Sequence, residues 1–438
     1  MPYPKANLPS AIITEDDFIS SYKAAKESTS SSPLGQHIGH YKAIVNDPIL
    51  VSMHASMMSI PFQVGIVPER WKPVTDIMLE KTPGDSKCHR LRIIALFESD
   101  LNHAKRILIG RKIAHHLEDN KMISEMQFGS RSGRRCLSAV LKKNLCHEYI
   151  RLSCQTAGFI EIDATGCYDR IMNNLILMVL RKLGLPLSVS TCMGTLWDAA
   201  IHLIKMLYGT SDVSYGSTKE TPLCGPGQGS MCGSLFWLLC YWLIVGSLDK
   251  NITALKFILV CKAVVVEITG VSFVDDTGLG VTSTYSPDLS LLEDQQYEEE
   301  IKHVVFSLMR LAQHWERTLF TTGGVLNLQK SFWYLMSWGW KNGVPYLLSN
   351  SHSAATVSLT SGYNTAPELL PRIEPSSSFR TLGVYLSPSG CQKKQCQVLR
   401  NHAQHYYDRV QFSSITPTEA LLSFFSLYKA QDQLSPSL

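Results

Sequence analysis

The stretch VSFVDDTGLGV, residues 271–281, places two adjacent aspartates, Asp275 and Asp276, between apolar strand-forming residues. β-Branched and aromatic residues favour strands, and Thr277 and Gly278 are of types found in turns, so the pattern predicts a hairpin that turns at the aspartates. One interpretation is that turns accept Asp for its local hydrogen bonds. The other is that two carboxylates at a rigid strand end form half of a divalent-metal site, which needs a third carboxylate.

A third carboxylate follows a second strand pattern, in GFIEIDATGCYDRI, residues 158–171. Ile160 and Ile162 alternate with acidic residues, and the chain turns toward an apolar helix after Asp163, which therefore ends the strand. If this strand lies beside the aspartate hairpin in one antiparallel sheet, three carboxylates converge at one sheet edge. Their repulsion is costly unless cations lie between them, and two Mg²⁺ ions do this while bridging to a nucleotide's phosphates.

The composition is that of an ordinary soluble protein. The 438 residues are 45% apolar and 18% charged, which is enough chain for roughly two to three domains. The formal charge of +4 is uneven, because residues 70–150 hold 16 Lys and Arg against 9 Asp and Glu, a net +7 that leaves −3 elsewhere. A basic lobe suits a polyanionic partner such as nucleic acid, although charged runs are also found on ordinary solvated faces.

Several classes of protein are disfavoured by the sequence. The twelve cysteines are scattered without a CxxC pair, and no basic start precedes an apolar segment. We therefore expect reduced cysteines in an intracellular compartment, either nucleus or cytoplasm. His37 with His40, and His402 with His405, lack partners at zinc-finger spacing. The longest apolar run, 235–245, is too short to span a bilayer and predicts a buried helix, so no membrane partner is expected.

The remaining pattern predicts an alternation of helices and short strands. The expected elements are a polar, mobile segment over 1–33, helical structure to about Ile66, a basic hairpin turning at Pro83-Gly84-Asp85, helices over Asn102 to Leu117 and about Leu137 to Leu152, and an amphipathic helix over 293–320.

Taken in order, three segments of the chain resemble the palm motifs of reverse transcriptases: DATGCYD (163–169), GPGQGSMCGSLF (225–236) and FVDD (273–276). Upstream, RLRIIAL (90–96) and QFGSRSGR (127–134) look like finger motifs of the non-LTR retrotransposon and group II intron branch. Downstream, GGVLNLQKS (323–331) and RTLGV (380–384) resemble its later motifs. The resemblance covers roughly residues 31–390, and the ordered set is far more specific than any one motif.

The resemblance implies an α+β right-hand polymerase fold, in which an antiparallel palm sheet packs on helices. The expected domains are a polar N-terminal segment (1–33), fingers with an N-terminal helical extension (34–155), a palm carrying the catalytic carboxylates with some finger and palm interleaving (156–345), and the palm end with the start of a truncated thumb (346–438). Only 48 residues follow Gly390. An endonuclease, where one takes part, is expected on another chain.

The resemblance also assigns the chemistry. Asp163 and Asp275 would be the main ligands of two catalytic Mg²⁺ ions, with Asp276 a weaker third ligand and Mn²⁺ an alternative metal. Tyr168 matches the aromatic steric gate that excludes a ribose hydroxyl, where the alternative is a core aromatic. Lys330 matches a lysine proposed to protonate departing pyrophosphate, where the alternative is a solvated lysine.

Further residues are assigned to the nucleotide and the template. Arg92 matches the finger arginine that clamps the triphosphate, with Lys81 or Lys87 assisting. Gln228 and Gly229 would approach the nascent base pair, although the residues around them depart from the family pattern. The template and primer candidates are Gln127, Phe128, Gly129, Arg131, Arg134, Arg135, Leu382 and Gly383. Arginine contacts to phosphates would make binding salt-dependent.

The predicted function is that of a retrotransposon-derived RNA-directed DNA polymerase, which adds dNTPs to a DNA or RNA primer on an RNA template. One alternative is an RNA-dependent RNA polymerase. Those enzymes commonly place an aspartate five residues after the first, whereas this chain has Tyr168 there and Asp169 one residue later. The other alternative is a catalytically inactive, truncated remnant that only binds nucleic acid.

Overall fold

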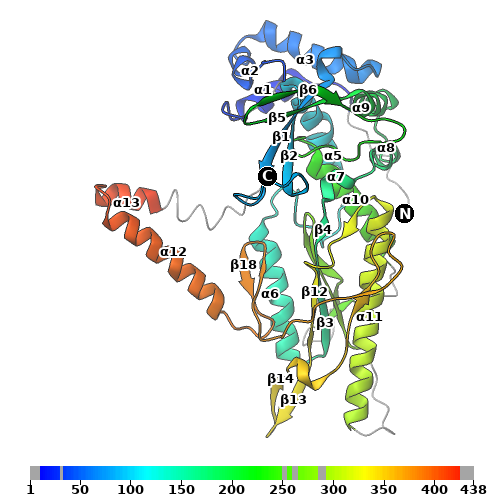
Figure 1. Ribbon diagram of the computed structural model, residues 1–438, viewed down its shortest axis with the longest axis vertical. Coiled ribbons are helices and arrows are strands. Elements are labelled where there is room, and N and C mark those ends of the chain that lie inside the picture. Colours follow the sequence, from blue (N-terminus) through cyan, green and yellow to red (C-terminus); the bar gives the residue numbers. More distant parts are fainter. Residues whose placement is uncertain (1–9, 30–32, 249–253, 259–264, 285–292, 425–438) are drawn as a thin grey trace. The chain divides into compact units, whose positions relative to one another are not determined.

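The structure is a computed structural model that describes residues 10–29, 33–248, 254–258, 265–284 and 293–424 (Figure 1). It mixes α-helices with several small β-sheets, as the sequence predicted. The chain forms two compact units that interleave along the sequence. Unit 1 comprises 1–124, 166–246 and 321–324, and unit 2 comprises 125–165, 247–320 and 325–438.

Unit 1 surrounds one four-stranded sheet with helices. Its elements are α1 (Glu15–Lys23), α2 (Ile38–Ile44), α3 (Pro48–Val64), η1 (Glu69–Trp71), β1 (Pro73–Glu80), η2 (Cys88–Arg90), β2 (Leu91–Leu96), α4 (Ser99–Lys105), the π-helical η3 (Arg106–Arg111), α5 (Lys112–Asp119), α7 (Cys167–Arg170), α8 (Asn173–Lys182), α9 (Leu187–Ala199), β5 (Ile201–Met206), β6 (Gly209–Tyr215) and α10 (Gly233–Ser247).

The sheet of unit 1 has the strand order β2-β1-β5-β6. Strand β1 pairs antiparallel with β2 and parallel with β5. The basic hairpin predicted from the sequence is therefore confirmed, and Gly84 at its turn has a φ of +85° that suits glycine. The predicted helix over Asn102 to Leu117 is also confirmed, as α4, η3 and α5 in succession.

The expectation of a mobile segment over 1–33 is wrong for α1. Thr14 caps this helix, because its side chain accepts from the N–H of Asp17 while the Asp17 carboxylate accepts from the N–H of Thr14. Phe18 and Tyr22 on the same helix are fully buried. The Ser-rich residues 28–32 suggested a mobile segment, but a short amphipathic helix precedes them. Residues 1–9 and 30–32 of the expected segment lie outside the described residues.

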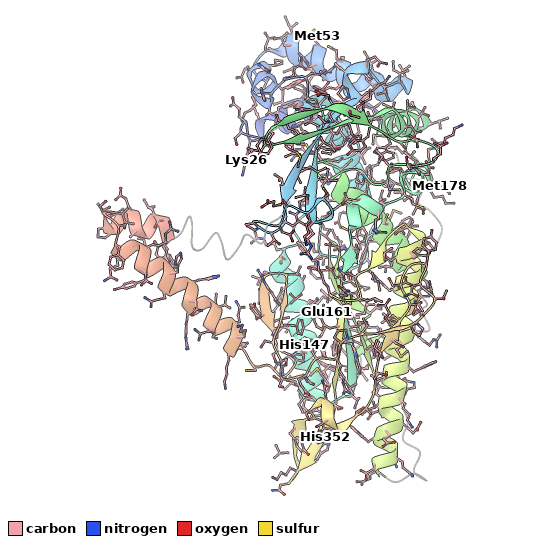
Figure 2. All side chains as sticks on the ribbon, viewed as in Figure 1. Lys26, Met53, His147, Glu161, Met178 and His352 are labelled. Atoms are coloured by element: carbon pink, nitrogen blue, oxygen red, sulfur yellow. The ribbon has the colours of Figure 1, made fainter. Side chains whose placement is uncertain are left out.

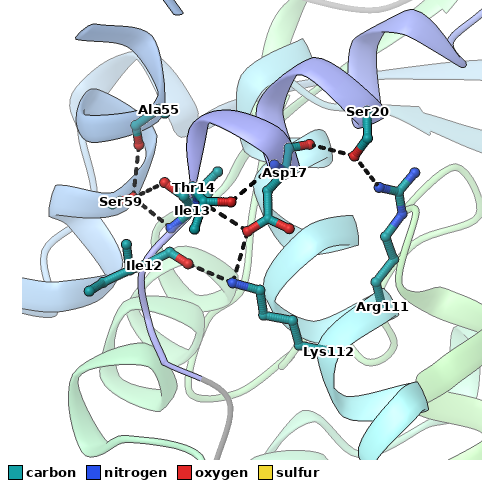
Figure 3. A network of polar contacts seen from close by, with 9 residues as sticks. All are labelled: Ile12, Ile13, Thr14, Asp17, Ser20, Ala55, Ser59, Arg111 and Lys112. Carbon is teal, nitrogen blue, oxygen red and sulfur yellow. Dashed lines mark hydrogen bonds and ion pairs between the residues drawn. The ribbon is translucent and has the colours of Figure 1, made fainter. Parts of the chain in front are cut away.

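Polar contacts fix α1 to its neighbours α3 and α5 (Figure 3). The ammonium nitrogen of Lys112, at the start of α5, lies 3.0 Å from a carboxylate oxygen of Asp17. The N–H of Ile13 donates to the hydroxyl of Ser59 on α3 at 2.9 Å. These bonds tie the first described residues to the body of unit 1.

Unit 2 is built around a second four-stranded sheet. Its elements are α6 (Cys136–Ser153), β3 (Ala157–Ile162), β4 (Ala164–Thr165), β7 (Leu255–Ile258), β8 (Val265–Ile268), β9 (Gly270–Phe273), β10 (Asp276–Thr282), α11 (Glu293–Thr321), β11 (Val325–Leu326), β12 (Phe332–Met336), β13 (Trp338–Lys341), β14 (Val344–Leu347), η4 (Asn350–His352), β15 (Ser358–Leu359), β16 (Glu368–Leu369), β17 (Phe379–Thr381), β18 (Val384–Leu386), α12 (Lys393–Gln411) and α13 (Pro417–Ser423).

The central sheet of unit 2 has the order β12-β3-β10-β9, with every pair antiparallel. Alternate residues of β3 face opposite sides, as strand geometry requires. Phe159 joins a core with Val140 and Ile150 of α6. A Cβ on Gly158 would lie 3.1 Å from Val304 of α11. Thus α6 covers one face of the sheet and α11 the other (Figure 1).

The turn of the aspartate hairpin differs from the sequence-based expectation. Thr277 and Gly278, expected as turn residues, lie inside β10, and the turn consists of Val274 and Asp275. Gly278 is a glycine for another reason: a Cβ there would lie 2.9 Å from a carboxylate oxygen of Glu161 on the adjacent strand. The glycine therefore leaves space for a charged side chain within the sheet.

The predicted buried helix at 235–245 is confirmed as α10, in which most side chains are buried. Within the described parts of the chain, no helix combines the length and the apolar composition needed to cross a bilayer. The predicted amphipathic helix over 293–320 is confirmed as α11.

Candidate functional site

The pairing of β3 with β10 brings carboxylates to one edge of the unit 2 sheet. Ile162, the last residue of β3, lies opposite Thr277 in the antiparallel register. Asp163 follows Ile162, and Asp276 precedes Thr277. Continued by one residue, the antiparallel register therefore sets Asp163 opposite Asp276. Asp275 adjoins them at the turn. The condition set by the sequence, that the two strands share one antiparallel sheet, is met.

Electrostatic interactions within this edge act on Asp276. Its pKa rises from 3.8 to about 6, first because the carboxyl is withdrawn from water and next because Asp275 lies beside it. Asp163 and Glu161 raise the pKa of Asp276 further, and the cation of Lys143 lowers it. Neighbouring negative charges that raise the pKa of Asp276 give this edge excess negative charge, to which a cation is attracted.

A buried ion pair lies beneath the acidic edge. The side chain of Lys143 on α6 is only 6% exposed, and its ammonium nitrogen lies 2.6 Å from a carboxylate oxygen of Glu161 on β3. The ammonium also donates to the hydroxyl of Thr381 at 3.2 Å. Figure 2 labels Glu161 together with His147, one helical turn beyond Lys143. The pair places a positive charge between helix and sheet, close to the negative edge.

The loop before β12 holds the backbone of Asp163. The N–H of Asn327 donates to the carbonyl of Asp163 at 2.8 Å, and the N–H of Asp163 donates to the hydroxyl of Ser331 at 3.3 Å. Between these residues, the side chain of Lys330 is 69% exposed, and its ammonium nitrogen lies 3.7 Å from a carboxylate oxygen of Asp163. Lys330 is thus next to the acidic edge and open to solvent.

The segment assigned to the template lies against the aspartate hairpin, and part of it is buried. Gln127 is fully buried and Phe128 is nearly so. Gly129 approaches the hairpin so closely that a Cβ there would lie 2.4 Å from the nitrogen of Val274. The side chains of Gln127 and Phe128 therefore face the interior of unit 2.

The three arginines of this segment differ in their availability. Arg131 is 5% exposed and pairs with Glu125 at 3.6 Å. Arg134 pairs with the same carboxylate at 2.5 Å and lies over the ring of Phe128. Arg135, the residue before α6, is exposed. Of the three side chains, Arg135 is the best placed to meet a phosphate.

Leu382 and Gly383 form the turn between β17 and β18, and both have positive φ, +50° and +84°. The side chain of Leu382 packs against the small core of Phe128, Ala139 and Val271. Gly383 is exposed. Leu382 therefore packs against Phe128 of the segment assigned to the template, whereas Gly383 lies at the surface.

The nucleotide candidates lie in unit 1. Arg92 is on β2 opposite Leu79 of β1, and its side chain is exposed. Lys81 follows β1, and Lys87 precedes η2; both are exposed. The hairpin thus presents these three cations to solvent.

The glycine-rich loop of unit 1 packs against β2 and α7. The side-chain amide of Gln228 donates to the carboxylate of Asp169 at 2.9 Å. The backbone carbonyl of Gln228 accepts from the N–H of Ala95 at 2.6 Å. A Cβ on Gly229 would lie 2.3 Å from the carbonyl oxygen of Ala95. The ring of Tyr168, on α7, lies in ordinary contact range of a Cβ at Gly233. The contacts of Gly229 within unit 1 already require glycine there.

Three residues near the carboxylates did not emerge from the sequence. Glu161 carried a signal, because it shares a strand face with Asp163 at a spacing of two. Lys143 and Ser331 carried none, since their roles depend on contacts far apart in sequence. All three act on the edge from within unit 2.

The donors of this edge fit magnesium. Carboxylate oxygens are the hard ligands it prefers, and it commonly takes one or two from the protein and the rest from water and phosphates. Among the described residues, no group of three or more His, Cys, Asp or Glu side chains is placed to hold a metal ion. An edge completed by water and substrate phosphate is consistent with both facts.

Comparison of the chain with models of protein families and with curated proteins found no match.

Proposed function

We propose that this protein is the core of an RNA-directed DNA polymerase of the non-LTR retrotransposon type. The observation that carries the proposal is the register of β3 and β10, which sets Asp163 beside Asp276 with Asp275 adjoining. In this proposal the sheet of unit 2 is the palm, the β1–β2 hairpin belongs to the fingers, and α12 with α13 begins a thumb.

Asp163 and Asp275 would hold two Mg²⁺ ions, with Asp276 as a weaker ligand. When bound, such ions activate a primer 3′ hydroxyl and neutralise the charge of the triphosphate. The protein's own contribution is to fix the carboxylates: Asn327 and Ser331 hold the backbone of Asp163.

Exposed cations would bind the phosphates. Arg92, assisted by Lys81 or Lys87, offers a planar guanidinium suited to bidentate phosphate contact. Lys330 would hold a proton near the leaving pyrophosphate, since its ammonium is solvent-exposed and 3.7 Å from Asp163. Tyr168 would exclude a ribose 2′ hydroxyl, and Gln228 with Gly229 would border the new base pair.

The partners in this proposal are an RNA template, a DNA or RNA primer and dNTPs, with any endonuclease on another chain. Arg135 is the best placed of its segment to contact a template phosphate, whereas Gln127 and Phe128 support the site from inside.

The test is primer extension on a poly(rA)/oligo(dT) duplex with Mg²⁺, comparing dTTP with UTP. Extension with dTTP in preference to UTP supports the proposal. Extension with UTP in preference to dTTP identifies an RNA polymerase instead. A folded chain that binds the duplex and extends with neither nucleotide identifies a binding remnant and overturns the proposal.

A further inference from the structure

The turn that carries Asp275 contains a strained residue. Val274 has a φ of +58°, in the left-handed region. β-Branched residues are genuine outliers there, and two-residue hairpin turns normally use Gly, Asn or Asp where φ is positive. Such a conformation persists only where surrounding groups hold it. The residue before a proposed metal ligand is therefore kept in a conformation that it would not choose alone.

One side chain bonds both polar groups of Val274. The amide oxygen of Gln127 accepts from the N–H of Val274 at 2.9 Å, and the amide nitrogen of Gln127 donates to the carbonyl of Val274 at 3.1 Å. The same amide oxygen accepts from the N–H of Gly129 at 2.8 Å. Gln127 is fully buried, so water does not compete for these bonds.

The backbone around Gln127 is itself anchored to β9. The N–H of Ser272 donates to the carbonyl of Met126, and the N–H of Phe128 donates to the carbonyl of Ser272, both at 2.8 Å. Phe128 packs with Ala139 and Val271. Residues 126–128 therefore form a short parallel extension of the sheet. This extension fixes the backbone position from which the Gln127 side chain reaches Val274.

We propose that Gln127 is a positioning residue, which holds Val274 in its left-handed conformation and thereby fixes the direction in which Asp275 leaves the turn. It does not touch substrate. The expected effect on catalysis rests on the proposed function. The clamp, meaning the hydrogen bonds from Gln127 to Val274, does not depend on that function and is measurable by unfolding. Only a primary amide of this length supplies one acceptor for two N–H groups and one donor for a carbonyl.

The test uses Gln127→Met, which keeps the length of the side chain and removes all three bonds, alone and combined with Val274→Gly. Glycine adopts positive φ without strain. We expect Gln127→Met to lower kcat for primer extension by roughly 10- to 100-fold, because small displacements of reacting groups are costly. The KM for dTTP should change by less than about threefold, since ground-state binding is unaffected. In the double variant, kcat should recover most of the loss.

A matched control exists on α11. Gln313 bonds Thr360 in the same manner, accepting from its N–H at 2.9 Å and donating to its carbonyl at 3.2 Å, away from the aspartates along the chain. Gln313→Met removes this amide clamp together with the bond that the same amide nitrogen donates to Glu316 at 2.9 Å. It should lower the urea midpoint of unfolding and leave kcat unchanged, and Val274→Gly should not compensate for it.

Folding measurements separate this proposal from the proposed function. If the wild-type chain extends no primer, the proposed function fails, and the clamp is tested by urea unfolding alone. Gln127→Met should lower the midpoint clearly more in the wild-type chain than in a chain that already carries Val274→Gly. Equal losses in both backgrounds, with no recovery of kcat where activity exists, would overturn the clamp. If Gln127→Met does not fold, Gln127→Asn, whose amide is one methylene too short to make the same bonds to Val274, replaces it in both comparisons.

Discussion

Lys143 on α6 places its ammonium nitrogen 2.6 Å from a carboxylate oxygen of Glu161, which lies on β3 two residues before Asp163 in the chain. The pair is largely buried, and Gly278 leaves the space that it occupies. A helix of unit 2 thus supplies the positive charge that partly balances the acidic edge of its sheet.

Removal of Lys143 should destabilise the protein strongly. Lys143→Met leaves the Glu161 carboxylate buried and unpaired, which costs about 3 kcal/mol in the free energy of unfolding. The double variant Lys143→Met with Glu161→Gln should regain most of this loss. Urea unfolding provides the measurement. Lys302→Met, which breaks an exposed pair with Glu299 on α11, is the control and should change little. Equal effects of the two lysine variants would contradict the account.

The pH dependence of stability should report on Asp276. Its pKa is raised in the folded protein, from 3.8 to about 6, so the folded state binds this proton more tightly than the unfolded state. Stability is therefore lost as pH rises from about 4 to about 6. In metal-free buffer, Asp276→Asn should be more stable than wild type by about 3 kcal/mol above pH 6 and by little below pH 4.

Urea unfolding at several pH values, with chelator present, checks this prediction. Asp294→Asn, at the exposed start of α11, controls for the loss of a carboxylate. A stability difference between Asp276→Asn and wild type that stays constant from pH 4 to pH 8 would show that Asp276 does not carry the proposed repulsion.

Magnesium should stabilise the folded chain. Ions that bind only the folded state raise stability, by about 1.4 kcal/mol at a concentration ten times Kd. Thermal unfolding with MgCl₂, compared with NaCl at the same ionic strength, provides the measurement. Asp163→Asn should abolish the difference, whereas Asp294→Asn should retain it. A Tm that responds equally to both salts would indicate screening alone.

The sequence was informative wherever local pattern decides structure. Alternating apolar residues predicted β3, β9 and β10, and the predicted pairing of the two aspartate-bearing segments in one antiparallel sheet is confirmed. The capping box at Thr14 and Asp17 is a local signal for α1, whereas the Ser-rich residues 28–32 favour an unstructured segment.

Other features depend on contacts that no local pattern encodes. The sequence pattern suggests that Gly278 is a turn residue, whereas in the structure it leaves space for Glu161 on the adjacent strand. Gln127 reads as a polar surface residue, yet it is buried because its amide bonds Val274, 147 residues later in the chain. Lys143 belongs to a helix whose other lysine, Lys142, carries no different local signature. Tertiary hydrogen bonds and ion pairs decide all three positions.

Tyr168 should govern sugar selection. Tyr168→Ala removes the ring that would meet a ribose 2′ hydroxyl, so incorporation of UTP relative to dTTP should rise by roughly 10- to 100-fold. The ratio of kcat/KM for the two nucleotides is the measurement. Tyr208→Ala, at a residue 98% exposed in unit 1, makes the same chemical change as a control. An unchanged ratio in Tyr168→Ala would show that Tyr168 does not act as the steric gate.

The most direct measurement is dTTP incorporation on poly(rA)/oligo(dT) with Mg²⁺ by wild type, Asp275→Asn and Asp294→Asn. Asp275→Asn keeps the size of the side chain and removes one proposed metal ligand, whereas Asp294→Asn makes the same change on the surface of α11. We expect extension by wild type and Asp294→Asn, and a loss of at least about 100-fold in Asp275→Asn. Extension that survives in Asp275→Asn, or no extension by a folded wild-type chain, would contradict the proposed function.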